Sequence, residues 1–345
     1  MNNINTIVEN YIRDHLSPKD EEKKEIKEKY SELSKILIGN NFQSGSYPRF
    51  TAISPVNDLD VIWELPAEML RQHFPEIFSV KKIIYPNHLN VKKIIDDLTS
   101  KLKIEYKDKA RVKPQTHSVG IYFGVSDDEF SIDIVPAIPL QEKNEYGEFL
   151  YLIPETGRLS KVKRLKRYDD TLREISWIKT DPRGYIKAAQ DINELNDNFR
   201  KSTKFIKTWK RNCKAQDEDF KLKSFHSEQI IYDIAKKNPN YNCFDTIVGF
   251  YTQLTARVSG ASISDRADST IKIDEYVNEL SEVQKNKIKT SNSNALSVID
   301  KIENTGDDRQ LKLLIEDLLL VKEEKKETIQ VSIAQKPYSR PYYQI

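Results

Sequence analysis

Apolar residues follow a helical period at the start of the chain. Between Glu21 and Ile38 they recur every three or four residues, which is typical of an amphipathic helix. The residues with this spacing are Ile26, Tyr30, Leu33 and Leu37. Ser17 is followed by a proline and, three residues on, by Asp20, which is the character of a helix N-cap. The pattern predicts that the first forty residues are largely helical.

Three later segments alternate between apolar and polar residues, as half-buried β-strands do. The first is Asp58–Glu64, with Leu59, Val61 and Trp63 on one face. The other two are His117–Val125 and Phe130–Ile138, and the turn sequence at 126–128 between them predicts a hairpin. A helical stretch is expected between the first strand and this hairpin, over residues 89–103.

Helical patterns dominate after residue 180. One helix is expected to begin at Asp181-Pro182. Further helices are predicted over residues 197–213, 224–236, 273–289 and 307–325. We therefore predict an α+β chain in which residues 1–180, with an N-terminal spine helix, form a mixed lobe and residues 181–330 form a helical lobe. Residues 331–345 contain two prolines and no helical period, so an extended tail is expected there.

The composition is that of a folded protein without a strong overall charge. Hydrophobic residues make up 38%, charged residues 31%, and the formal net charge is +2, too small for a general nucleic-acid field. The two cysteines, Cys213 and Cys243, have no metal-ligand spacing and form no disulfide framework, which favours a reducing cytoplasm. The N-terminal residues show no signal-peptide pattern, and no run of about 18 apolar residues occurs, so no membrane association is expected.

Three aspartates on the predicted strands give the strongest chemical signal. Asp58 and Asp60 stand two residues apart, so both side chains leave the same face of a strand. Two carboxylates so close repel each other unless a cation lies between them, and Mg²⁺ prefers such oxygen ligands. Asp133 on the third strand would help to hold a second ion, and two ions activate a hydroxyl nucleophile and stabilise a leaving pyrophosphate. A single aspartate would be read as a solvated strand residue, but the combination favours catalysis.

Two further features suit a nucleoside triphosphate. Gly45-Ser46 precedes Asp58 by thirteen residues, and glycine allows close backbone approach to a phosphate while serine adds a donor. A stripe of basic residues is also predicted on one helix face, formed by Arg200, Lys204, Lys207 and Arg211. Lys207 is the candidate phosphate contact in this stripe, and a solvated helix face is the alternative.

These motifs carry a family resemblance. Gly45-Ser46, Thr51-Ala52-Ile53 and Asp58-Leu59-Asp60 resemble the signature of the polymerase-beta-like nucleotidyltransferases. With the segment 130–137 around Asp133, they resemble one subgroup, the bacterial cGAS/DncV-like nucleotidyltransferases (CD-NTases), which make cyclic oligonucleotide signals in anti-phage defence. Segments 177–182, 204–210 and 223–228 resemble later parts of these proteins, so the resemblance spans residues 35–270.

Two departures from the family pattern are visible. Ser264-Asp265-Arg266 stands where relatives often have an Asp-Pro pair, and the proline is missing. No zinc-binding insertion like that of the animal DNA sensor is present, which argues against sensing double-stranded DNA in that way.

The resemblance implies a set of roles. The fold would be a nucleotidyltransferase core with a helical lobe, and the active site would lie in the cleft between them. Asp58, Asp60 and Asp133 would be catalytic and would bind two Mg²⁺ ions, with Mn²⁺ as a substitute. The nucleotide-binding residues would be Gly45, Ser46, Lys207 and Ser224.

The resemblance also implies partners and a product. The substrates would be NTPs, namely ATP, GTP or a pyrimidine NTP, joined into a cyclic di- or trinucleotide of the CBASS defence system. The product would act on an effector protein, and an activating partner is conceivable, whereas nucleic acid is not expected. Two alternatives stay open: modification of a protein, RNA or small molecule on the same core, and a catalytically silent NTP-binding scaffold.

Overall fold

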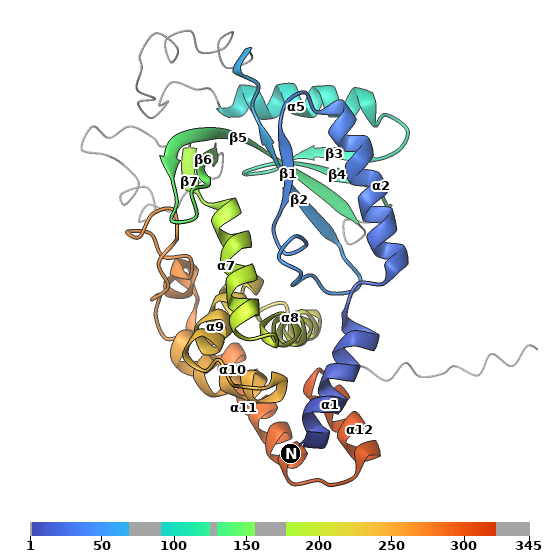
Figure 1. Cartoon of the computed structure of the whole chain (residues 1–345), viewed down its shortest axis with the longest axis vertical. Coiled ribbons are helices and arrows are strands. Elements are labelled where there is room, and N and C mark those ends of the chain that lie inside the picture. Colours follow the sequence, from blue (N-terminus) through green and yellow to red (C-terminus); the bar gives the residue numbers. More distant parts are fainter. Residues whose placement is uncertain (1, 69–90, 125–129, 156–176, 322–345) are drawn as a thin grey trace, which may run out of the picture.

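The chain folds into a sheet-based part and a helical part (Figure 1). The computed structural model describes residues 2–68, 91–124, 130–155 and 177–321. The turn predicted at 126–128 and the tail predicted at 331–345 lie outside these residues. The predicted α+β class, a mixed sheet with helices followed by a helical part, is confirmed.

The described residues contain one seven-stranded sheet. Its strands are β1 (Asn41–Ser44), β2 (Asp58–Glu64), β3 (Arg111–Pro114), β4 (Val119–Tyr122), β5 (Ser131–Lys143), β6 (Phe149–Pro154) and β7 (Trp177–Thr180). The order is β1-β2-β5-β4-β3, and β6 pairs with both β5 and β7. Strands β4 and β5 form the predicted antiparallel hairpin, whereas β2 and β5 run parallel, which brings Asp58 and Asp60 beside the strand of Asp133.

One face of the sheet is covered by α2 (Asp20–Ile36) and α5 (Val91–Glu105) (Figure 1). Leu59, Val61 and Trp63 point into this layer and are buried there, as their alternation predicts. Helix α2 starts after Lys19 rather than after Ser17, because the Glu22 carboxylate accepts the backbone N–H of Lys19 at 2.9 Å. The opposite face of β2 carries Asp58 and Asp60, followed by Ile62, which is buried against Ala137 and Tyr151.

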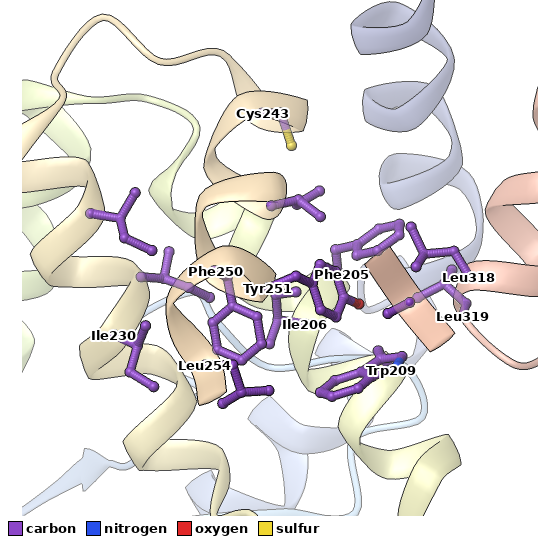
Figure 2. Close-up of a cluster of buried hydrophobic side chains, with 14 of the residues drawn as sticks. Phe205, Ile206, Trp209, Ile230, Cys243, Phe250, Tyr251, Leu254, Leu318 and Leu319 are labelled. Atoms are coloured by element: carbon purple, nitrogen blue, oxygen red, sulfur yellow. The ribbon is translucent and has the colours of Figure 1, made fainter. Parts of the chain in front are cut away.

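The helical part follows β7. Its elements are α7 (Pro182–Leu195), α8 (Phe199–Gln216), α9 (Ser224–Lys237), α10 (Cys243–Arg257), the 3₁₀ helix η2 (Glu275–Glu279), α11 (Glu282–Glu303) and α12 (Asp308–Leu318). Trp209 lies at the centre of the core, with its ring centroid 5.0 Å from Tyr251 and 6.2 Å from Phe250 (Figure 2). The helix starting at Asp181-Pro182 is present, and the Asp181 side chain caps it by accepting the N–H of Gly184.

One helical prediction was wrong, and one helix was missed. Residues 273–289 do not form one helix, because Ser281 caps a new helix, α11, by accepting the N–H of Gln284. Helix α10 was not predicted at all, although Asn242 caps it in the same way through the N–H of Asp245.

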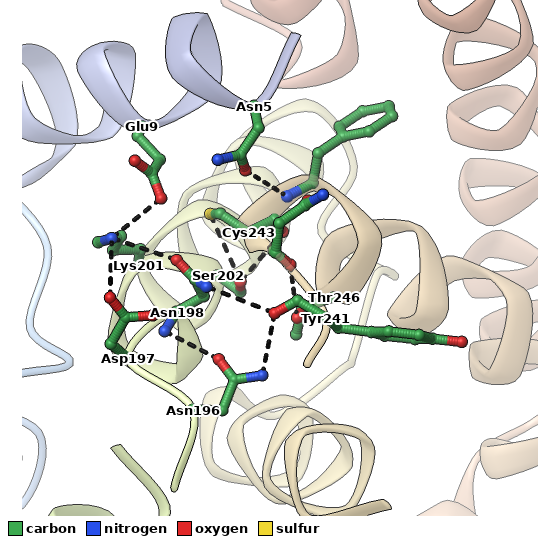
Figure 3. Close-up of polar contacts among 12 residues, drawn as sticks. Asn5, Glu9, Asn196, Asp197, Asn198, Lys201, Ser202, Tyr241, Cys243 and Thr246 are labelled. Atoms are coloured by element: carbon green, nitrogen blue, oxygen red, sulfur yellow. Dashed lines mark hydrogen bonds and ion pairs between the residues drawn. The ribbon is translucent and has the colours of Figure 1, made fainter. Parts of the chain in front are cut away.

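The start of the chain packs with the helical part. Helix α1 (Asn2–Tyr11) and the π-helical turn η1 (Ile12–Leu16) contribute Ile7, Val8 and Ile12 to the core that contains Trp209. Figure 3 shows the polar contacts that accompany this packing: Lys201 donates to Glu9 at 2.9 Å, and the Phe244 N–H donates to Asn5 at 3.2 Å. Residues 2–16 thus contribute to the core of the helical part, while the division of the chain into lobes at residue 180 stays a prediction.

Two absences noted in the sequence can be compared with the structure. Across the described ranges, no helix has both the length and the apolar character needed to cross a membrane. Cys213 and Cys243 are buried and have free thiols.

Candidate active site

A cavity of about 740 Å³ lies between the polar face of β2 and the helices α7, α8 and α9. Its lining includes every predicted site residue except Asp133: Gly45, Ser46, Asp58, Asp60, Lys207 and Ser224. A space of this size is within the usual range for a small-molecule or cofactor site. The predicted residues come from distant parts of the sequence, and the fold brings them to one place.

The three aspartates come together through strand register. In the parallel pairing of β2 with β5, Asp60 lies opposite Asp133, and Asp58 lies opposite Ser131. Side chains two residues apart on a strand share a face, so Asp58 and Asp60 stand on the side where Asp133 also emerges. Asp58 is exposed, whereas Asp60 and Asp133 are half-buried.

The electrostatics of these carboxylates favour a cation. Burial and the charges of Asp58 and Asp133 raise the pKa of Asp60 to about 7. Burial also raises the pKa of Asp133, against the effect of a 2.9 Å hydrogen bond donated by Gln115. Such an all-oxygen donor set fits Mg²⁺ or Mn²⁺ in chemistry. Among the residues that the structure describes, however, no three acids, histidines or cysteines are positioned to hold a metal ion, and the metal-binding roles stay a prediction.

Gly45 is in contact with the side chain of Asp60. Its φ of +69° lies in the left-handed region, and a Cβ added there would be 1.8 Å from Oδ2 of Asp60. Any other residue at position 45 would therefore be strained in its backbone and would collide with the carboxylate. Glycine here lets the turn and Asp60 occupy adjoining space in the cavity wall.

Residues 46–49 form a tight turn after Gly45. The turn ends in a Schellman arrangement, in which the Thr51 N–H donates to the Ser46 carbonyl and the Phe50 N–H donates to the Tyr47 carbonyl, each at 3.0 Å. Phe50 has the left-handed φ of +60° that this ending requires. Gly45 and Ser46, where the turn begins, both line the cavity.

Ser224 and Lys210 form the opposite, helical wall. Lys210 on α8 donates to the hydroxyl of Ser224 at the start of α9, at 3.0 Å. Arg211 and Lys214, also from α8, line the same cavity. The cations of this wall thus stand across from the carboxylates of β2, an arrangement that suits a triphosphate bridging the two. The sequence prediction did not name Lys210, although its spacing from Trp209 and Lys207 places it on the adjoining helix face.

Lys207 has a different environment from the one predicted. It lines the cavity, but its ammonium is buried and lies 2.6 Å from Glu228, and it also donates to Thr51. Arg49 makes a second ion pair with Glu228 at 2.6 Å. Burial would raise the pKa of Glu228, but Arg49 and Lys207 lower it to about 2, so the carboxylate is ionised. Arg49 and Glu228 could not be paired from the sequence, since no local pattern joins residues 179 positions apart.

One family model matches the N-terminal half of the chain. Residues 3–157 match the family described as Second Messenger Oligonucleotide or Dinucleotide Synthetase domain. The matched region contains Gly45, Ser46 and all three aspartates, but not the helices that carry Lys207, Lys210 and Ser224. No curated protein matches the sequence.

Several solved structures share the fold. CdnC of E. coli MS115-1, in a structure with ATP, has 17% sequence identity and a TM-score of 0.62, covering 91% of this chain and 96% of that one. The CD-NTase CdnG of Bradyrhizobium diazoefficiens, in complex with GTP, has 12% identity and a TM-score of 0.59, covering 91% and 98%. The Vibrio cholerae DncV cyclic AMP-GMP synthase has 13% identity and a TM-score of 0.56, covering 81% and 68%. Together with the family model, these matches confirm the resemblance that the sequence motifs predicted.

Proposed function

We propose that this chain condenses NTPs into a cyclic di- or trinucleotide with release of pyrophosphate. Residues 3–157 match the model of a second-messenger nucleotide synthetase domain, and the fold is that of the cGAS/DncV-like nucleotidyltransferases. The observation that carries this proposal is the cavity in which Gly45, Ser46 and the β2 aspartates face Lys210 and Ser224. One wall supplies carboxylates and the other supplies cations, as a metal-bound triphosphate requires.

The proposed binding mode assigns one part of the triphosphate to each wall. The N–H groups at Gly45 and Ser46 and the Ser46 hydroxyl would hold the γ-phosphate. Lys210 and Ser224 would hold the triphosphate from the helical side, with Lys210 taking the direct contact that the sequence assigned to Lys207. That change is proposed because the Lys207 ammonium already has Glu228 and Thr51 as partners. Within the described ranges, Lys210 donates a hydrogen bond to the Ser224 hydroxyl and to no other group.

The proposed reaction is an in-line displacement at the α-phosphorus. A ribose hydroxyl of one nucleotide forms the new P–O bond, the bond from the α-phosphorus to the bridging oxygen breaks, and pyrophosphate leaves with that electron pair. Asp58, Asp60 and Asp133 would hold divalent ions, which when bound neutralise the developing charge. Asp133, whose pKa is raised by burial, is the proposed acceptor of the hydroxyl proton. Repeating the step on the second nucleotide closes the ring.

The biological role is proposed from the same likeness. Production of a cyclic nucleotide that acts on an effector in CBASS anti-phage defence is the role expected of this group. CdnC is known in a complex with a HORMA protein, and we propose that a protein partner regulates this chain also. The cations and hydroxyl groups in the cavity wall, Lys210, Arg211, Ser46 and Ser224, support nucleotides as the proposed substrates.

The test is incubation of the protein with labelled NTPs and Mg²⁺, followed by phosphatase treatment and mass spectrometry. The expected result is that the wild-type protein forms a phosphatase-resistant cyclic oligonucleotide. The variant Asp58→Asn/Asp60→Asn should form less than about a hundredth of the wild-type amount. Asp96→Asn/Asp97→Asn, a pair of exposed acids on α5, is the matched control and should keep full activity. Label on protein or RNA would indicate the other transferase activity. NTP binding without any product, with or without candidate partners, would indicate a scaffold.

A further inference from the structure

Glu228 is the anionic centre of a buried network that joins the helical part to the turn after Gly45. Its carboxylate is 1% exposed and lies 2.6 Å from both the Arg49 guanidinium and the Lys207 ammonium. The Thr51 hydroxyl donates to it at 3.0 Å. Breaking a buried ion pair by removing one partner is costly, because the remaining charges stay buried without compensation. The contacts that Glu228 makes are therefore strongly maintained.

These contacts reach the proposed phosphate-binding turn from behind. Arg49 is the last residue of the turn and Thr51 completes its Schellman ending, so both lie within six residues of Gly45. Gly45 at the other end of the turn packs against Asp60. Glu228 itself does not line the cavity. It can influence a bound nucleotide only through the residues that it holds.

We propose that Glu228 is a positioning residue for nucleotide binding. Through Arg49 and Thr51, it fixes the Gly45–Ser46 turn in the place where that turn receives the triphosphate. This inference rests on the proposed function, because it takes the cavity to be a nucleotide site. This role explains why α9 has a buried acid one helical turn after Ser224. Ser224, the first residue of α9, would contact the phosphate, and Glu228, the fifth, would hold the turn in the opposite wall of the cavity.

A general contribution of Glu228 to stability must be separated from this role. Asp274 is the matched control, since it is a fully buried acid in the helical part that accepts the N–H groups of Ser262 and Ile263. It also lies 3.8 Å from His226 on α9, so it contacts the helix of Glu228, but within the described part of the chain it makes no hydrogen bond or ion pair with residues 45–51. Glu228→Gln and Asp274→Asn each replace a buried carboxylate by an amide of the same shape. Both should lower the melting temperature, and only the first should alter the turn.

The first measurement is amide hydrogen exchange of residues 45–51 in the nucleotide-free protein. Exchange there is expected to be at least about tenfold faster in Glu228→Gln, because the anchors of the turn are lost, and unchanged in Asp274→Asn. The second measurement is steady-state kinetics. Glu228→Gln should raise the KM for NTP about 10- to 100-fold and change kcat much less, because the turn holds the phosphates in the ground state and the transition state alike.

Thr51→Val keeps every charge in the network and decides the matter if Glu228→Gln does not fold. It should show the same faster exchange at residues 45–51 and a smaller rise in KM. The positioning role would be overturned if Glu228→Gln and Thr51→Val had the same exchange rates at residues 45–51 and the same KM as Asp274→Asn. Since exchange is measured without nucleotide, a wild-type protein that makes no product would refute the proposed function and leave this test intact.

Discussion

Gly45→Ala is the substitution for which the structure gives the most specific prediction. The alanine must adopt the left-handed φ of +69°, which costs an L-residue about 1–2 kcal/mol. Its Cβ would also lie 1.8 Å from Oδ2 of Asp60, so the carboxylate must rotate away, at a further cost of about 1 kcal/mol. We expect the free energy of unfolding to fall by roughly 2–3 kcal/mol in total.

Gly147→Ala separates the two parts of this cost. Gly147 has a similar φ of +75°, but a Cβ there would meet nothing within 4 Å. It should therefore lose only the backbone contribution, about 1–2 kcal/mol, with product formation unchanged. Gly45→Ala should in addition reduce product formation about 100-fold, because a displacement of about 1 Å at a reacting centre has effects of that size.

The assays are chemical denaturation and quantification of the cyclic product. A double-mutant cycle with Asp60→Ala isolates the clash, since Gly45→Ala should cost about 1 kcal/mol less when the Asp60 carboxylate is absent. If the two substitutions are additive in stability, and Gly45→Ala behaves like Gly147→Ala, the contact between Gly45 and Asp60 does not have the importance assigned to it here.

Three further predictions concern charge and packing. Lys210→Met should raise the KM for NTP about tenfold or more. The control, Lys236→Met at the far end of α9, should leave the KM unchanged. Equal KM values in these two variants would refute the triphosphate contact of Lys210. In metal-free buffer, the stability of the wild type relative to Asp60→Asn should decline as the pH rises from 4 to 7, by about 1–4 kcal/mol, because the folded protein binds the Asp60 proton more tightly (pKa about 7) than the unfolded chain does. Thermal unfolding with a chelator measures this decline, saturating Mg²⁺ should reduce it, and a pH-independent difference would contradict the pKa assignment. Ile12→Ala should lower the free energy of unfolding by about 2–4 kcal/mol, because Ile12 is 2% exposed in the helical core. The control, Ile104→Ala, changes an exposed residue and should lower it by less than about 0.5 kcal/mol. Equal losses in urea denaturation would argue against the packing of the N-terminal residues.

Elements that are determined by a local pattern or by a single capping residue could be predicted from the sequence. Alternation within Asp58–Glu64 fixed the strand to its observed ends and placed Asp58 and Asp60 on one face. Asp181-Pro182 marked a helix start that the structure contains. In the same way, Asn242 before α10 and Ser281 before α11 were readable signals, and reading them would have corrected both helical errors.

What the sequence withheld depends on contacts between distant segments. Asp60 and Asp133 belong together because β2 and β5 pair in parallel, and no local pattern states that register. The partner of Lys207 is a glutamate on another helix, so helical spacing alone suggested a free phosphate ligand. Strands β3, β6 and β7 are short and lack clear alternation. They became strands through pairing, β3 with β4, β6 with β5, and β7 with β6.

The packing of α1 bears on the order in which the protein folds. Helices α1 and α12 lie side by side (Figure 1), and Asn3 donates a hydrogen bond to Asp308. Strands β1 to β7 need only residues 41–180, so the sheet can form while the chain is still emerging from the ribosome. Helices α8, α10 and α12 pack against α1 and η1, so the apolar face of Ile7, Val8 and Ile12 stays uncovered until these later helices have been made. During synthesis α1 is therefore buried after the sheet that follows it in the sequence, and its apolar face is open to chaperones in the meantime.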